Sequence, residues 1–140
     1  LDGDNSTSFA FIQGATYIEQ VVSGFTVGQE YTLSLEFNAR NCCGDAPIGT
    51  IWLNDIEAAS SKDLFPDPGA IVPSGGEWYS ADIDFEAPTE SITLRIASEP
   101  AAGGDATMIV DNVSFTLVPE PASSLMVIIG GLGLLAMRRR

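Results

Sequence analysis

Two adjacent cysteines carry the most distinctive chemistry of this sequence. Cys42 and Cys43 lie in "NARNCCGDAP" and are the only cysteines of the chain. A bridge between neighbouring residues closes a strained ring, and Gly44, Asp45 and Pro47 favour a tight turn directly after it. We expect a vicinal disulfide that stiffens this loop and presents a flat apolar plate to a ligand ring. The alternative is two thiols that are free or paired between molecules. Zinc is not expected, because adjacent thiolates lack the usual ligand spacing and the chain has no histidine.

One aspartate is placed at an inward position by strand alternation. In "MIVDNVSFTLV", Asp111 shares its parity with Val113, Phe115 and Leu117, so strict alternation turns its carboxylate toward the core. A buried carboxylate needs hydrogen-bond partners or a cation. The alternative is a bulge that turns Asp111 to solvent, or a role in capping a turn.

Two tryptophans are candidate platforms for a ligand. Trp52 alternates with Ile51 and Leu53, and Trp78 has the parity of the polar Ser80. Exposed aromatic rings stack on the apolar faces of sugars. The alternative is that each ring closes one end of the fold. The candidate ligand-binding residues are therefore Cys42, Cys43, Asp45, Trp52 and Trp78.

Catalysis and nucleic-acid binding are both disfavoured. The chain has no histidine, no nucleophile elbow and no phosphate-binding loop. Its carboxylates alternate outward on predicted strands, which is typical of a solvated face, so we expect no catalytic residue and no enzyme. The formal net charge is −13, and residues 1–117 hold 3 basic and 18 acidic residues. Phosphate backbones would be repelled by such a body.

The elements that must position these residues are strands. "YTLSLEFNAR" alternates apolar and polar residues, as do "WYSADIDFEA", "SITLRIAS" and "MIVDNVSFTLV". Weaker strand patterns occur in "SFAFIQ", "TYIEQVV" and "GTIWL", and turn-forming residues separate them. We find no convincing helix in residues 1–117. Seven short strands with regular punctuation predict an all-β fold, an antiparallel β-sandwich.

The last part of the chain predicts a membrane segment. Sixteen residues, 122–137, carry no charge, and Arg138, Arg139 and Arg140 follow them. As a helix they span roughly 24 Å, which is short but usable against a hydrocarbon core of about 30 Å. The arginines would stay on the cytoplasmic side and the acidic body would lie outside. A buried amphipathic helix is the alternative, but the segment offers no polar face.

This tail resembles a known sorting signal. Pro119, Glu120 and Pro121, then a glycine-bearing apolar segment, then Arg138–Arg140, look like the PEP-CTERM signal. The resemblance implies a Gram-negative exported protein that an exosortase cleaves near the triplet, and a link to extracellular polysaccharide. The mature domain would be anchored in the inner membrane and then reach the cell surface or the extracellular matrix. The expected organisation is a sandwich in 1–117, a linker in 118–124 and a transmembrane helix with an arginine tail in 125–140.

The body resembles bacterial jelly-roll domains of the carbohydrate-binding-module and galactose-binding-like kind. The resemblance rests on "FIQG", "IEQVVSGFTVGQEYTLSLEFNARN", the "WY" strand and "ATMIVDNVSF", and covers most of residues 5–117. It implies a sugar ligand and a structural calcium held by Asp111 with a glutamate on an earlier strand. That strand, with its Asn-Gly-x-Phe-Glu-like segment, is absent here, and the chain begins with Leu1. We therefore expect an N-terminally truncated sandwich with an exposed sheet edge, and a signal peptide further upstream.

Two functions follow from these patterns. The first is a carbohydrate-binding module attached to exopolysaccharide or another glycan, without a required cofactor. The second is a structural surface or biofilm-matrix protein without a specific ligand. Convergence of the "NCCGDAP" loop and a tryptophan on one groove favours the first function, whereas scattered aromatic residues favour the second.

Overall fold

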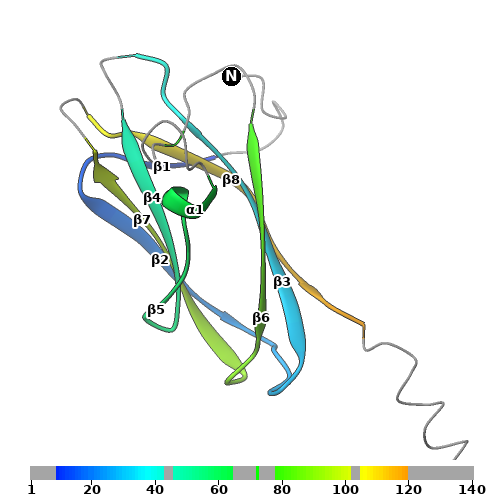
Figure 1. Ribbon diagram of the computed structural model, residues 1–140. Helices are drawn as coiled ribbons and strands as arrows, with labels where there is room; N and C mark the ends of the chain where they lie inside the picture. Colours follow the sequence, from blue (N-terminus) through cyan, green and yellow to red (C-terminus); the bar gives the residue numbers. More distant parts are fainter. Residues whose placement is uncertain (1–8, 43–45, 65–71, 73–77, 102–104, 120–140) are drawn as a thin grey trace, which may run out of the picture.

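Two four-stranded antiparallel sheets pack face to face in the chain (Figure 1). The computed structural model describes residues 9–42, 46–64, 72, 78–101 and 105–119. The first sheet has the order β1-β8-β3-β6, and the second has the order β2-β7-β4-β5. The first sheet consists of β1 (Ala10–Ile12), β8 (Met108–Leu117), β3 (Glu30–Ala39) and β6 (Tyr79–Glu86). The second sheet consists of β2 (Thr16–Ser23), β7 (Ser91–Pro100), β4 (Pro47–Leu53) and β5 (Ile56–Ser60). This arrangement confirms the predicted β-sandwich.

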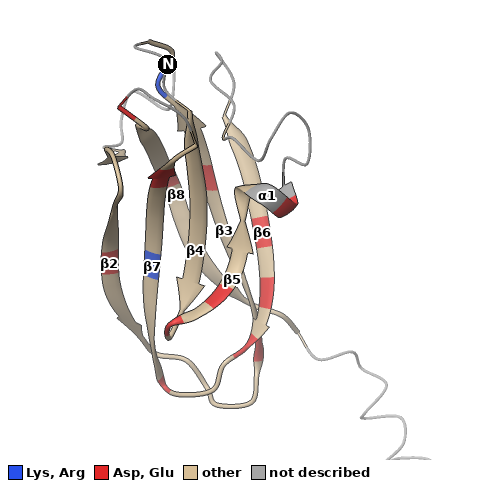
Figure 2. Ribbon diagram, turned by 60° about the vertical axis from the view of Figure 1, so that its left-hand side comes forward, with Lys and Arg blue, Asp and Glu red and all other residues tan. Residues whose placement is uncertain are grey.

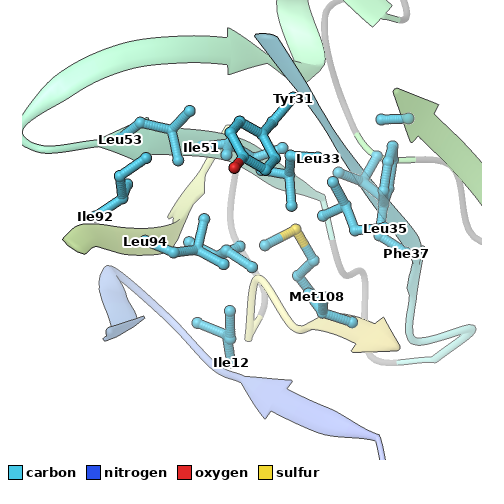
Figure 3. Close-up of a cluster of buried hydrophobic side chains, with 14 of the residues drawn as sticks. Ile12, Tyr31, Leu33, Leu35, Phe37, Ile51, Leu53, Ile92, Leu94 and Met108 are labelled. Atoms are coloured by element: carbon cyan, nitrogen blue, oxygen red, sulfur yellow. The ribbon is translucent and has the colours of Figure 1, made fainter. Parts of the chain in front are cut away.

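The core lies between the sheets and follows the predicted alternation. In β3 and β7 every second side chain is buried, and the inward residues of both sheets meet in one cluster (Figure 3). Each fully buried aliphatic side chain contributes about 1.5–3 kcal/mol of transfer free energy. At one end, Phe25 packs edge-on against Tyr31 and Phe115, with ring centroids 4.9 and 5.2 Å apart. The cluster makes the two sheets a single rigid support for the residues on their outer faces.

Two short elements differ from the sequence prediction. The structure has an eighth strand, β5, whose "IEAAS" lacks the β-branched run that marks strands. It forms because Asn54 and Asp55, with φ of 51° and 62°, make a two-residue turn that folds the chain back on β4. A one-turn helix, α1 (Ser61–Leu64), follows β5, so the expectation of no helix in residues 1–117 is wrong. Four residues are too few to produce a periodic pattern in the sequence.

The alternation expected along β8 is interrupted at its bulge. Asn112 has a φ of 51°, and the register between β3 and β8 shifts between Ser34 and Glu36. A bulge of this kind changes which face the side chain beside it occupies. Past the bulge the expected inward parity holds, because Phe115 pairs with the buried Leu33 and packs against the core. Val113 and Leu117 share this parity and are 42% and 50% exposed.

One side of the sandwich is open in the part of the chain that the structure describes. β1 pairs with β8 only at Met108, Ile109 and Val110, so the outer edge of β8 from Asp111 onward has no strand beside it there. Two hollows of about 450 and 210 Å³ lie between β2 and β8, and both reach Leu94 of the core. Edge strands of this length usually need cover or charge to stay soluble.

No helix among the described residues is long and apolar enough to cross a membrane. The transmembrane helix expected in residues 125–140 lies outside the described residues, as do Glu120, Pro121 and Arg138–Arg140 of the sorting signal. The sandwich ends at Leu117, and Pro119, the last described residue, is exposed.

Candidate functional site

The outer face of the second sheet brings aromatic and charged side chains into one row. Cross-strand pairing places Glu19 of β2 beside Arg95 of β7, Arg95 beside Trp52 of β4, and Trp52 beside Glu57 of β5. Directly opposed residues of antiparallel strands share a face, so all four side chains lie on the surface away from the core. Figure 2 shows the basic segment of β7 between acidic segments of β2 and β5. We call this row, together with Tyr17 and Asp55, the outer row.

Arg95 is the central residue of the outer row and is held from three directions. Its Nε and Nη2 donate to Glu19 Oε2 at 2.7 and 2.6 Å, and its Nη1 lies 2.9 Å from Asp55 Oδ1. The Tyr17 ring lies against the guanidinium, with its centroid 4.9 Å from Cζ. The hydrogen bond to Glu19 is the main reason why the pKa of Arg95 is raised above its usual value. Arg95 therefore stays cationic and fixed in place, with its side chain 30% exposed.

The position of Asp55 depends on local backbone chemistry. Asn54 and Asp55 adopt the left-handed region that short polar residues tolerate, and together they form the turn between β4 and β5. Asn54 Oδ1 also accepts a hydrogen bond from Thr93 N at 2.8 Å, which ties the turn to β7. The turn thereby holds the Asp55 carboxylate over Arg95.

Two aromatic rings flank the guanidinium on neighbouring strands. Tyr17 on β2 is 56% exposed, and Trp52 on β4 is half-buried. β7 separates β2 from β4, so the two strands are about 10 Å apart. The accessible parts of the two rings offer apolar surfaces for stacking, while the nearby guanidinium and carboxylates offer donors and acceptors. This combination suits a flat ligand that is apolar on its faces and rich in hydroxyls at its edges.

The sequence-predicted tryptophans do not meet. Trp52 lies in the outer row, as its parity predicted. Trp78 directly precedes β6 of the other sheet and is half-buried. Its indole Nε1 is buried and has no hydrogen-bond partner among the described residues, which fits a packed ring better than a ligand platform.

The cysteine loop connects β3 to β4 in the chain. Cys42 is exposed and lies three positions after Ala39, the last residue of β3, whereas Cys43 and Asp45 lie outside the described residues. The vicinal disulfide and a ligand contact at this loop therefore stay predictions. Trp52 lies five positions into β4 from Pro47, about 17 Å along the strand. Pro47, at the described end of this loop, is therefore well separated from Trp52.

Asp111 lies on the outer face of the first sheet. It pairs across strands with Glu36, and its Oδ1 accepts a hydrogen bond from Asn112 N at 2.8 Å. Asn112 Nδ2 in turn donates to Glu36 Oε2 at 2.7 Å. This is the bulge alternative, and the inward orientation expected for Asp111 is wrong. The described residues contain no group of three or more side chains of the types that hold a metal ion. The calcium site stays a prediction that the structure does not test.

Sequence reasoning missed most of the outer row. Tyr17, Glu19 and Arg95 belong to strands that were recognised, but their cross-strand neighbours depend on strand order, which the sequence does not state. One signal was present: Arg95 is the only basic residue of β7, at an outward position between leucine and isoleucine. The single cation of a strand in an acidic chain is a natural place to look for carboxylate partners.

Comparison with known proteins supports the fold. No family model matches the chain, and no curated protein matches it in sequence. Among solved structures, the C-terminal domain of EclA, described as a sugar-binding protein, superposes with a TM-score of 0.63 at 16% identity, and 81% of each chain is covered. A CBM4 structure gives a TM-score of 0.51 at 17% identity, over 79% of this chain and 71% of the other. A family 35 carbohydrate-binding module from an environmental isolate gives 0.51 at 16% identity, over 86% and 84%. The chain therefore has the jelly-roll fold of carbohydrate-binding-module-like domains.

Proposed function

We propose that this protein binds a glycan on the outer row. The observation that carries the proposal is the fixed Arg95 with Tyr17 against it and Trp52 beside it, on the outer face of the second sheet. Aromatic rings supply stacking surface, and the guanidinium and carboxylates supply hydrogen bonds to hydroxyl groups. The fold shared with sugar-binding modules supports the proposal. The protein has no catalytic role in this proposal.

The test is binding of the full chain to a panel of immobilised polysaccharides, followed by isothermal calorimetry on the best of them. We expect saturable binding that weakens at least about tenfold in Trp52→Ala, because one stacked ring commonly contributes a kilocalorie or more. Val27→Ala is the matched control, since Val27 is exposed in the turn before β3 and does not belong to the outer row. A folded protein that binds no glycan would leave the structural surface or matrix role instead.

The proposed setting is the cell exterior of a Gram-negative bacterium. The support is the order of the tail, in which Pro119, Glu120 and Pro121 follow one residue after β8, then an apolar segment, then Arg138–Arg140. In this proposal an exosortase removes the apolar segment and releases an acidic sugar-binding domain. Mass spectrometry of the protein from cells with and without exosortase tests it. An intact tail in both strains would contradict the proposal.

A further inference from the structure

We propose that the outer row selects uncharged glycans and rejects those that carry carboxylate groups, with Glu19 and Asp55 as the specificity-determining residues. This inference rests on the proposed function. It concerns a property that the fold does not dictate, because the same sandwich can present either sign of charge on its face.

The first step is that the positive charge of Arg95, the cation of the outer row, is already neutralised. Arg95 is the one basic residue of the outer row, and both Glu19 and Asp55 bind it at hydrogen-bond distance. To form a bidentate salt bridge with Arg95, the carboxylate of a uronate would have to displace a carboxylate that the fold holds in place. The Tyr17 ring covers one face of the guanidinium as well.

The second step is the charge that remains. The outer row contains three carboxylates, Glu19, Asp55 and Glu57, and one guanidinium, a formal balance of −2. The other arginine whose side chain the structure describes, Arg40, is bound to Asp105 at 2.6 Å. The whole chain carries −13. An anionic polymer is therefore repelled by the negative charge of the outer row, and added salt screens this repulsion.

The third step is that the same carboxylates suit hydroxyl groups. An exposed carboxylate accepts several hydrogen bonds, and the side chain of Asp55 is 78% exposed above the row. A neutral sugar chain offers hydroxyl donors to these oxygens and apolar ring faces to Tyr17 and Trp52. A neutral sugar chain can therefore contact every group of the outer row without electrostatic repulsion.

The experiment measures the affinity of the full chain for three neutral β-1,4-linked polymers, namely glucan, xylan and galactan. The affinity for the glucan and the galactan is measured again after their C6 hydroxyl groups have been oxidised to carboxylates. The full chain should bind a neutral polymer and bind its oxidised form at least about tenfold more weakly. Added salt should leave the neutral affinity unchanged and strengthen the residual binding of the oxidised polymer.

The decisive variant is Glu19→Gln with Asp55→Asn, which leaves the charge of Arg95 uncompensated while the side-chain sizes are kept. In this variant the affinity for the oxidised polymer, divided by the affinity for the neutral polymer, should rise about tenfold. Asp55→Asn alone is the second variant, because asparagine suits the positive φ of this turn, and it should raise the ratio by a smaller factor. Glu30→Gln with Glu86→Gln is the matched control, since it removes the same charge from the opposite sheet and should leave the ratio unchanged.

The outcomes separate the two claims. Equal affinity of the wild-type chain for a neutral polymer and its oxidised form overturns the selectivity and leaves glycan binding standing. An equal rise of the ratio in the control pair assigns the effect to net charge and removes the roles of Glu19 and Asp55. Absence of binding to every polymer, with a folded protein, overturns both claims.

Discussion

At the scale of single residues, the outer row depends on pairings between neighbouring strands. Glu19, Arg95 and Trp52 lie on three different strands, 76 residues separate Glu19 from Arg95, and only the register brings them together. Ion pairs this exposed stabilise a fold little. Their effect is to fix the orientation of Arg95, and changes here should alter binding more than folding.

Substitution of Tyr17 tests whether the outer row contributes to binding rather than to folding. Tyr17→Ala should weaken glycan binding about five- to tenfold, because it removes a stacking surface that is 56% exposed. The melting temperature should fall by no more than about 2 °C, since surface changes rarely cost more than half a kilocalorie. Calorimetric titration and thermal unfolding of the same samples provide both numbers. A large loss of stability with unchanged affinity would contradict the assignment of Tyr17 to the site.

Gly49 is a second informative residue, and its effect is on the core. A Cβ atom at this position would lie 2.8 Å from Met108 Sδ and 3.5 Å from Val72 Cγ2. Met108 and Val72 are both buried, so room for the methyl group must come from a shift of packed side chains. Gly49→Ala should destabilise the protein by about 1–3 kcal/mol in urea unfolding.

A double-mutant cycle identifies the cause of that loss. Met108→Val shortens the side chain that the new methyl group meets, so the two substitutions together should cost about 1 kcal/mol less than the sum of their separate costs. Additive costs would show that the close approach to Met108 is not the reason.

At the scale of elements, the turn between β4 and β5 carries both a strand and a site residue. Asn54 has a positive φ, and its side chain accepts a hydrogen bond from Thr93 N. β5 has a weak strand sequence, so the turn and the pairing with β4 must specify it. The same turn determines where Asp55 lies.

Asn54→Ala should therefore cost about 1–2 kcal/mol, from the lost hydrogen bond and from the strain of an alanine at positive φ. Asp55→Gly is the control, because glycine adopts this conformation freely and should change stability by less than about 0.5 kcal/mol. Chemical denaturation measures both variants. Equal costs in the two variants would mean that turn geometry does not stabilise β5.

At the scale of the whole molecule, unbalanced negative charge is the main electrostatic feature. The chain has 6 basic and 19 acidic residues, and the outer face of the first sheet pairs Thr32 and Ser34 with Asp84 and Asp82 at 2.7 and 2.6 Å. These hydrogen bonds organise the carboxylates locally but do not neutralise them. Self-repulsion lowers the stability of a compact state with such a charge.

Salt should then stabilise the protein. An increase of NaCl from about 10 mM to about 0.5 M shortens the screening length severalfold and should raise the melting temperature by a few degrees. Glu30→Gln with Glu86→Gln removes two facing charges and should reduce that salt dependence. A melting temperature that falls with salt would show that ion pairs, such as Arg95 with Glu19, outweigh the repulsion.

The amino-acid sequence by itself determined the class of fold and most of the strands. Alternation of apolar and polar residues is a local property, and in β3 and β7 it matches the observed burial at nearly every position. It also placed Trp52 on an outward face. Where local signals are weak or broken, as in β5, α1 and the bulge at Asp111, prediction from the sequence was wrong.

Only the tertiary structure decided which side chains meet. The sequence made Trp52, Trp78 and the cysteine loop equal candidates, and strand order then separated Trp78 from Trp52 and joined Trp52 to Arg95. The physical reason is that contacts between strands depend on chain topology and register, which arise from packing of the whole core and leave no periodic trace along the chain.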